Sequence, residues 1–151
     1  MSRLLGIDLG ERRIGLAVGD EATGIARGLG TIARGSLDRD ATTIGRLASE
    51  HGAAGLVIGL PLRLDGAEGP QAAATRAWGT ALGARLGLAV FWRDERLTSV
   101  AAEEELGRPP RGRSGGPPSR AALGRRRAAI DREAARLILQ AELDDRARVT
   151  R

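Results

Sequence analysis

"GIDLGERRIGLAVGD", residues 6–20, decides the fold, because it holds two short apolar runs separated by a turn. The first run predicts a strand that ends near Asp8, the second predicts a strand from Arg13, and the glycine of "GERR" suits a hairpin turn. Asp8 is unusual in such a strand, since burying a lone carboxylate costs several kcal/mol. The stretch therefore predicts a hairpin that carries an acid at the end of its first strand.

Outside this hairpin the chain alternates between strand and helix patterns. We expect a third strand, then alternating helices and strands, then two closing helices, at residues 26–33, 36–52, 54–60, 70–87, 88–92, 100–106 and 125–146. This order predicts an α/β fold with a five-stranded mixed sheet, in which the first three strands form an antiparallel meander and helices flank the sheet. A length of 151 residues fits a single domain over 1–151.

The composition excludes several kinds of site. The chain has no cysteine, which excludes disulfides, thiol nucleophiles and zinc–thiolate sites, and its single histidine, His51, excludes schemes that need two imidazoles. Carboxylates are then the most plentiful groups for binding a metal or moving a proton, and they favour a hard cation such as Mg²⁺ or Mn²⁺. Neither a signal peptide nor an apolar run of about 20 residues is apparent, so we expect a cytoplasmic protein with no membrane partner.

Positive charge is concentrated near the C-terminal end. The net charge is +5, yet residues 107–136 carry nine arginines and two acids, a net charge of +7, which leaves −2 for the rest. This concentration favours a nucleic-acid partner held by its phosphate backbone; a solvated basic loop is the alternative. The stretch 107–122 is rich in Arg, Pro and Gly, and we expect a mobile loop there.

Acids near the carboxyl ends of strands are candidates for chemistry, because ligands of open α/β sheets bind there. Asp8 ends the first strand, and Asp94 and Glu95 follow the fifth, where alternation of side chains allows only one to face the site. Asp131 lies at the edge of the apolar face of the last helix, and Asp20 is a candidate supporting acid. Each could instead be a turn acid or a partner of neighbouring arginines.

Five blocks, in order and spacing, resemble a known family: "GIDLGERRIGLAVGD", "ARGLGTI", "VIGLPLRLDGAEGPQA", "FWRDERLTSVAAE" and "IDREAARLILQAELD". The chain is similar over residues 3–145 to the YqgF/RuvX family of pre-16S rRNA nucleases and Holliday junction resolvase-like proteins. The resemblance implies an RNase H-like fold and a metal-dependent phosphodiesterase. It also implies an acidic site at Asp8, Glu95 and Asp131, and so selects Glu95 over Asp94.

The sequence departs from the family pattern beside these acids. The family more often has a Thr-Lys pair where Glu11 and Arg12 stand, a serine at Gly19 and a lysine at Arg132. Arg12 and Arg132 keep the positive charge without the compact contact of a lysine. Glu11 adds a negative charge next to the proposed metal site.

The resemblance and the charge pattern together predict a two-metal nuclease in which Asp8 bridges the ions and Glu95 and Asp131 complete the cage. We expect it to process the 5′ end of precursor 16S rRNA; the alternatives are a Holliday junction resolvase acting on four-way DNA junctions and an inactive nucleic-acid-binding module. A resolvase would need a homodimer, whereas an rRNA nuclease can be a monomer. The predicted nucleic-acid contacts are Arg12, Arg108, Arg111, Arg113, Arg120, Arg125, Arg126, Arg127 and Arg132.

Overall fold

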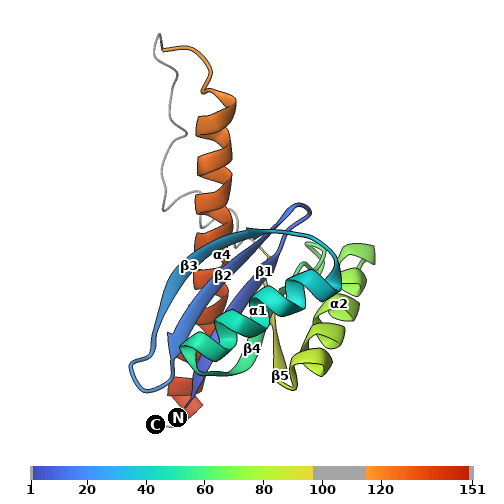
Figure 1. Cartoon of the computed structure of the whole chain (residues 1–151), viewed down its shortest axis with the longest axis vertical. Helices are drawn as coiled ribbons and strands as arrows, with labels where there is room; N and C mark the ends of the chain where they lie inside the picture. Colours follow the sequence, from blue (N-terminus) through green and yellow to red (C-terminus); the bar gives the residue numbers. More distant parts are fainter. Residues whose placement is uncertain (1, 97–114, 150–151) are drawn as a thin grey trace.

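The hydrophobic pattern of the chain is realised as an alternation of strands and helices (Figure 1). The computed structural model describes residues 2–96 and 115–149. Its elements are β1 (Arg3–Leu9), β2 (Arg13–Asp20), β3 (Ile25–Ala33), α1 (Leu37–His51), β4 (Ala53–Leu60), α2 (Pro70–Leu86), β5 (Ala89–Asp94) and α4 (Arg120–Val149). The predicted helix 100–106, the loop residues 107–114 and Arg108, Arg111 and Arg113 lie outside the described residues.

The sheet has the strand order β3-β2-β1-β4-β5. β1 pairs with β2 and β2 with β3 in antiparallel fashion, whereas β1 pairs with β4 and β4 with β5 in parallel. This confirms the five-stranded mixed sheet with an antiparallel meander. The carboxyl ends of β1, β4 and β5 consequently meet at one edge, which is also the edge of the β1–β2 turn.

Alternation along β1 divides the core between the two faces of the sheet. Leu5 and Ile7 are buried in the cluster that α1 and α2 cover, while Leu4 is buried in the cluster that α4 covers. A Cβ on Gly6 would lie 2.8 Å from the Cβ of Leu139, so α4 packs directly on the backbone of β1. Leu4, Gly6 and Asp8 are alternate residues of one strand and therefore lie on the same face. The side chain of Asp8 consequently points toward the α4 side.

The ends of α1 match their predicted caps. The Ser36 hydroxyl accepts a hydrogen bond from the backbone N–H of Arg39 at 3.2 Å, and Gly52 ends the helix with φ 65°. Pro70 opens α2, as its fixed φ and missing N–H favour. α1 and α2 are therefore placed by local signals together with the apolar face that each buries.

The last helix is longer than the sequence pattern predicts. It begins at Arg120 rather than near residue 125 and ends at Val149 rather than near 146, so residues 120–122 are helical and do not belong to the predicted loop. The reason is a cap, because the Ser119 hydroxyl accepts a hydrogen bond from the N–H of Ala122 at 3.1 Å. The first turns of α4 extend beyond the sheet, as Figure 1 shows. None of the helices within residues 2–96 and 115–149 is both long and apolar enough to span a membrane.

Candidate functional site

Asp8 lies between two glycines on the neighbouring strands. Gly15 pairs with Asp8 on β2, and on β4 Gly59 follows Ile58, which pairs with Ile7. Neither glycine has a side chain, so the α4 side of the sheet is left open on both sides of the acid. Glu95 occupies the space above Gly59, and the backbone of α4 at Asp131 occupies the space above Gly15.

Glu95 fills the space above Gly59. A Cβ on Gly59 would lie 2.7 Å from Oε2 of Glu95, and the Glu95 N–H donates to the carbonyl of Leu60 at 3.2 Å, which extends the pairing of β5. The alternation of β5 explains the direction of this side chain. Two residues earlier, the Arg93 guanidinium contacts Glu142 of α4 at 3.3 Å, so Glu95 faces the α4 side as well.

Asp94 points away from Glu95, toward the other face of the strand. Its carboxylate accepts a hydrogen bond from the Arg96 Nε at 2.6 Å, and this contact lowers the pKa of Asp94. Trp92, two residues earlier on the same face of β5, packs against the core beneath α1 and α2, as parity requires. Asp94 still raises the pKa of Glu95 through its charge, so its place is beside the acid pair rather than within it.

Asp8 and Glu95 form a hydrogen-bonded pair of acids. Burial, followed by the hydrogen bond to Asp8 and the charges of Asp8 and Asp94, raises the pKa of Glu95 from 4.5 to about 9. Burial also raises the pKa of Asp8, an effect that the hydrogen bond from Glu95 opposes and the charge of Asp131 reinforces. The protonated Glu95 therefore donates to the Asp8 carboxylate near neutral pH.

Asp131 lies on the opposite side of Asp8 from Glu95, and its backbone fills the space above Gly15. A Cβ on Gly15 would lie 2.2 Å from the Asp131 carbonyl oxygen, so only glycine allows α4 to approach β2 this closely. The Asp131 carboxylate accepts a hydrogen bond from Nε of Arg13 at 3.1 Å, in a partly buried ion pair. In the described part of the chain, no three or more His, Asp or Glu side chains are arranged so that they could hold a metal ion.

The structure does not bring Asp20 to this cluster, which corrects its prediction as a supporting acid. The register of the hairpin pairs Asp20 with Arg3, at the opposite end from the Asp8–Gly15 pair. Its carboxylate accepts a hydrogen bond from the N–H of Ala22 at 2.8 Å and lies 3.6 Å from Nε of Arg3. Asp20 is a turn acid, the alternative that its position in the sequence left open.

A basic groove of about 600 Å³ runs from the β1–β2 turn along the first turns of α4. Its lining includes the arginines Arg12, Arg13, Arg120, Arg126 and Arg127. A smaller cavity of about 260 Å³ is lined by Arg12, Arg13 and Arg127 too, and also by Asp131. The groove on the projecting part of α4 therefore adjoins a cavity that includes Asp131.

Two of the predicted arginine contacts lie elsewhere. The stem of Arg132 packs over β3, where a Cβ on Gly28 would lie 2.6 Å from its Cγ. Arg125 is exposed and does not line the groove. The sequence reasoning missed Arg13, Gly15 and Gly59; counting the hairpin register back from the turn could have placed Gly15 opposite Asp8.

Sequence comparisons relate the chain to a known family. A family model described as "RuvX: Holliday junction resolvase" matches residues 2–145. A Myxococcus xanthus protein named "Putative pre-16S rRNA nuclease" is 42% identical over 142 residues, 94% of this chain and 87% of that protein. One of the same name from Nitrobacter hamburgensis is 43% identical over 141 residues, 93% of this chain and 80% of that protein.

A likeness among solved structures concerns the fold alone. The structure of "T. thermophilus RuvC in complex with Holliday junction substrate" superimposes with a TM-score of 0.55 at 14% sequence identity, over 97% of this chain and 96% of that one. RuvC has an RNase H-like fold, and the prediction of that fold is confirmed.

Proposed function

Because the chain belongs to the RuvX family, we propose that it is a metal-dependent nuclease that processes the 5′ end of precursor 16S rRNA during ribosome biogenesis, in the cytoplasm. The observation that carries this proposal is the hydrogen-bonded pair of buried acids, Asp8 and Glu95, near Asp131, which lines a small cavity that shares three arginines with the basic groove. The names of the relatives support nuclease chemistry on nucleic acid and suggest precursor rRNA as the substrate.

The acid cluster has the donor chemistry that a hard divalent cation such as Mg²⁺ or Mn²⁺ requires. Asp8 and Glu95 are carboxyl groups within hydrogen-bonding distance, and without a cation they avoid mutual repulsion by sharing a proton. Asp131 is near enough for its charge to act on Asp8, although its carboxylate contacts Arg13. We propose that Asp8 and Glu95 would hold the divalent ions and that Asp131 would join them when it exchanges Arg13 for a metal.

The chain's own residues supply position and charge. Bound divalent ions, two in the scheme that we propose, would supply activation of the attacking water and neutralisation of the leaving oxygen. Asp8 lies on a paired strand between Gly15 and Gly59, so its carboxylate is held rigidly and no neighbouring strand side chain blocks the phosphate. Arg12 and Arg127, which line both the groove and the cavity beside Asp131, would hold substrate phosphates by forked hydrogen bonds.

A cleavage assay tests the proposal with two substrates: a precursor 16S rRNA fragment that retains its 5′ extension, and a four-way DNA junction. Each is incubated with Mg²⁺, Mn²⁺ or EDTA, and Asp8→Asn protein prepared in parallel controls for contaminating nucleases. We expect cleavage of the rRNA fragment at its mature 5′ end with either metal and none with EDTA. Full metal-dependent cleavage by Asp8→Asn would show that the site assignment is wrong.

The same assay decides between the proposed function and its alternatives. The family description names a Holliday junction resolvase, so preferential cleavage of the junction would replace the rRNA proposal. A resolvase cuts two symmetric strands and needs two sites, so sedimentation should then show a dimer. Salt-sensitive binding of both substrates with no cleavage in any metal would indicate an inactive binding module.

A further inference from the structure

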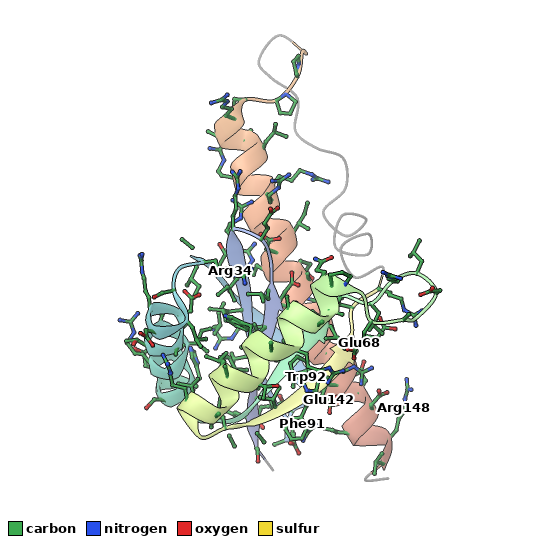
Figure 2. All side chains as sticks on the ribbon, turned by 90° about the vertical axis from the view of Figure 1, so that its right-hand side faces the viewer. Arg34, Glu68, Phe91, Trp92, Glu142 and Arg148 are labelled. Carbon is green, nitrogen blue, oxygen red and sulfur yellow. The ribbon has the colours of Figure 1, made fainter. Side chains whose placement is uncertain are left out.

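A cavity on the other side of the β1–β2 turn has no role in the site described above. This turn cavity, about 430 Å³ in volume, lies between the turn, Arg34 and the first turns of α2. Figure 2 shows Arg34 near the end of the sheet where the β1–β2 turn lies. Gly10 and Glu11 line both the turn cavity and the small cavity beside Asp131.

The three cavities therefore adjoin one another around the β1–β2 turn. The basic groove shares three arginines with the cavity beside Asp131, and that cavity shares two turn residues with the turn cavity. A nucleic-acid strand that follows the basic groove to the acids would leave them over the turn. The turn cavity lies in its path, beyond the position of the bond to be cleaved.

The turn cavity has three kinds of hydrogen-bond donor beside it: the Arg34 guanidinium, the N–H groups at the start of α2 and the Thr75 hydroxyl. Nη1 of Arg34 donates to the carbonyl of Gly10 at 3.0 Å, which anchors the guanidinium and leaves other N–H groups for a ligand. Gly69, at the N-cap of α2, has no side chain with which to cap the N–H groups of the first turn, and Gln71 lines the cavity from that turn.

Thr75 gives independent evidence for a ligand. Its side chain lines the turn cavity although the residue is only 3% exposed. The structure gives its hydroxyl no hydrogen-bond partner within residues 2–96 and 115–149. Among the described residues, the buried side-chain atoms without a partner are Asp40 Oδ2 and Trp78 Nε1, so the Thr75 hydroxyl is instead open to the cavity and available to a polar group that enters from outside.

We propose that the turn cavity binds a backbone phosphate of the nucleic-acid strand, on the opposite side of the cleaved bond from the basic groove. This rests on the proposed function for the position of the bond, but the binding itself needs no cleavage. Arg34, the first turn of α2 and the Thr75 hydroxyl supply donors for a phosphate. Glu11 lines the same cavity, and its carboxylate opposes the phosphate and weakens its binding.

The test measures binding without cleavage. The probe is a fluorescein-labelled single-stranded RNA of about 16 nucleotides, and a DNA of the same sequence is run in parallel; anisotropy is recorded in EDTA over a range of salt concentrations. Arg34→Gln should weaken binding about fivefold and reduce the slope of log K against log salt by about 0.7, the value for one phosphate contact. Thr75→Val, which keeps the shape of the side chain, should weaken binding about twofold.

Two further variants separate a phosphate site from a structural effect. Glu11→Gln should strengthen binding about twofold, because it removes the opposing charge, and general damage to the fold could not do so. Arg46→Gln makes the same charge change on α1, where Arg46 is 69% exposed and lines none of the three cavities, so it should bind like wild type. Thermal denaturation confirms that each variant is folded.

The outcomes also separate the two proposals. If Arg34→Gln and Glu11→Gln both bind like Arg46→Gln, the turn cavity is not a phosphate site, whatever the cleavage assay shows. If both shift binding in the expected directions while wild type cleaves neither substrate with metal, the phosphate site stands and the proposed nuclease activity is wrong. Equal shifts with RNA and DNA are expected, since a phosphate contact does not read the sugar.

Discussion

The two ends of the β1–β2 hairpin carry the same kind of residue in opposite surroundings. Asp8 and Asp20 each stand close to glycine, but Asp20 has Arg3 at 3.6 Å and a turn N–H at 2.8 Å to compensate its charge. Asp8 has another acid, Glu95, as its hydrogen-bond partner, and burial raises the pKa of both. Both acids therefore have a nearby glycine, and what distinguishes Asp8 is its burial beside a second acid.

The largest effect is expected when the two aspartates themselves are substituted. Asp8→Asn should lower metal-dependent cleavage by about three orders of magnitude, since it removes the ligand that the proposed ions share. Asp20→Asn makes the same change at the other end and should cleave like wild type. Initial rates on the rRNA fragment at saturating Mg²⁺ measure both, and equal losses in the two variants would contradict the distinction between the ends.

The next effect concerns the glycines that let α4 approach β2. Gly15→Ala would place a Cβ 2.2 Å from the carbonyl oxygen of Asp131, so the helix backbone must move and the free energy of unfolding should fall by about 3 kcal/mol. Gly19→Ala, at the other end of β2, meets the Leu143 Cδ1 at 2.7 Å, a side-chain tip that can rotate.

The control should therefore cost less, about 1 kcal/mol. Urea denaturation of both variants gives the two free energies, and the m-values verify that the same surface unfolds. A Gly19→Ala loss as large as that of Gly15→Ala would show that the backbone contact at the Asp8 end is not special.

Much of the fold was predictable because its signals are local. Ser36 and Gly52 bound α1, and short apolar runs predict the strands. The start of α4 was not predictable from periodicity, because its first turns extend beyond the sheet and their beginning is marked by the Ser119 cap.

The candidate site was predictable in part. Glu95 and Asp94 could not be separated by residue type, and the family resemblance chose Glu95, the acid that the structure places beside Asp8. Asp20 shows the limit of such reasoning, since only the strand register reveals that it lies at the other end of the sheet. The ion pair of Arg13 with Asp131 joins residues 118 positions apart and has no local signal.

The raised pKa of Glu95 should make the stability of the protein depend on pH. The folded protein holds a proton on Glu95 up to a pKa of about 9, whereas the unfolded chain releases it near 4.5. The free energy of unfolding should therefore fall as the pH rises from about 4.5 to about 9. Denaturation of wild type in EDTA across this range measures the decline, and Glu95→Gln, which cannot ionise, should flatten it.

Asp94→Asn is the matched control for this experiment. Its neighbour Arg96 lowers the pKa of Asp94, so the stability that Asp94 contributes is lost only as the pH falls below its ordinary value of 3.8. The variant should keep most of the decline between about pH 5 and 9. A decline that persists in Glu95→Gln would assign it to another group.

The smallest effect is expected for the two arginines that pair with Asp131 on α4 and with Asp20 on β2. Arg13 pairs with Asp131 at 3.1 Å, and Arg3 lies 3.6 Å from Asp20. If Asp131 must leave Arg13 to reach a metal, the ion pair competes with metal binding. Such a partly exposed pair contributes at most about 1 kcal/mol, which corresponds to about fivefold in affinity.

Arg13→Gln should consequently bind Mg²⁺ up to about fivefold more tightly than wild type, whereas Arg3→Gln should bind it unchanged. Isothermal titration in the absence of nucleic acid measures both affinities independently of cleavage. A weaker affinity in Arg13→Gln would mean that Arg13 orients the Asp131 carboxylate toward the metal instead of competing for it. The sign of this one change thus decides whether the ion pair restrains the site or completes it.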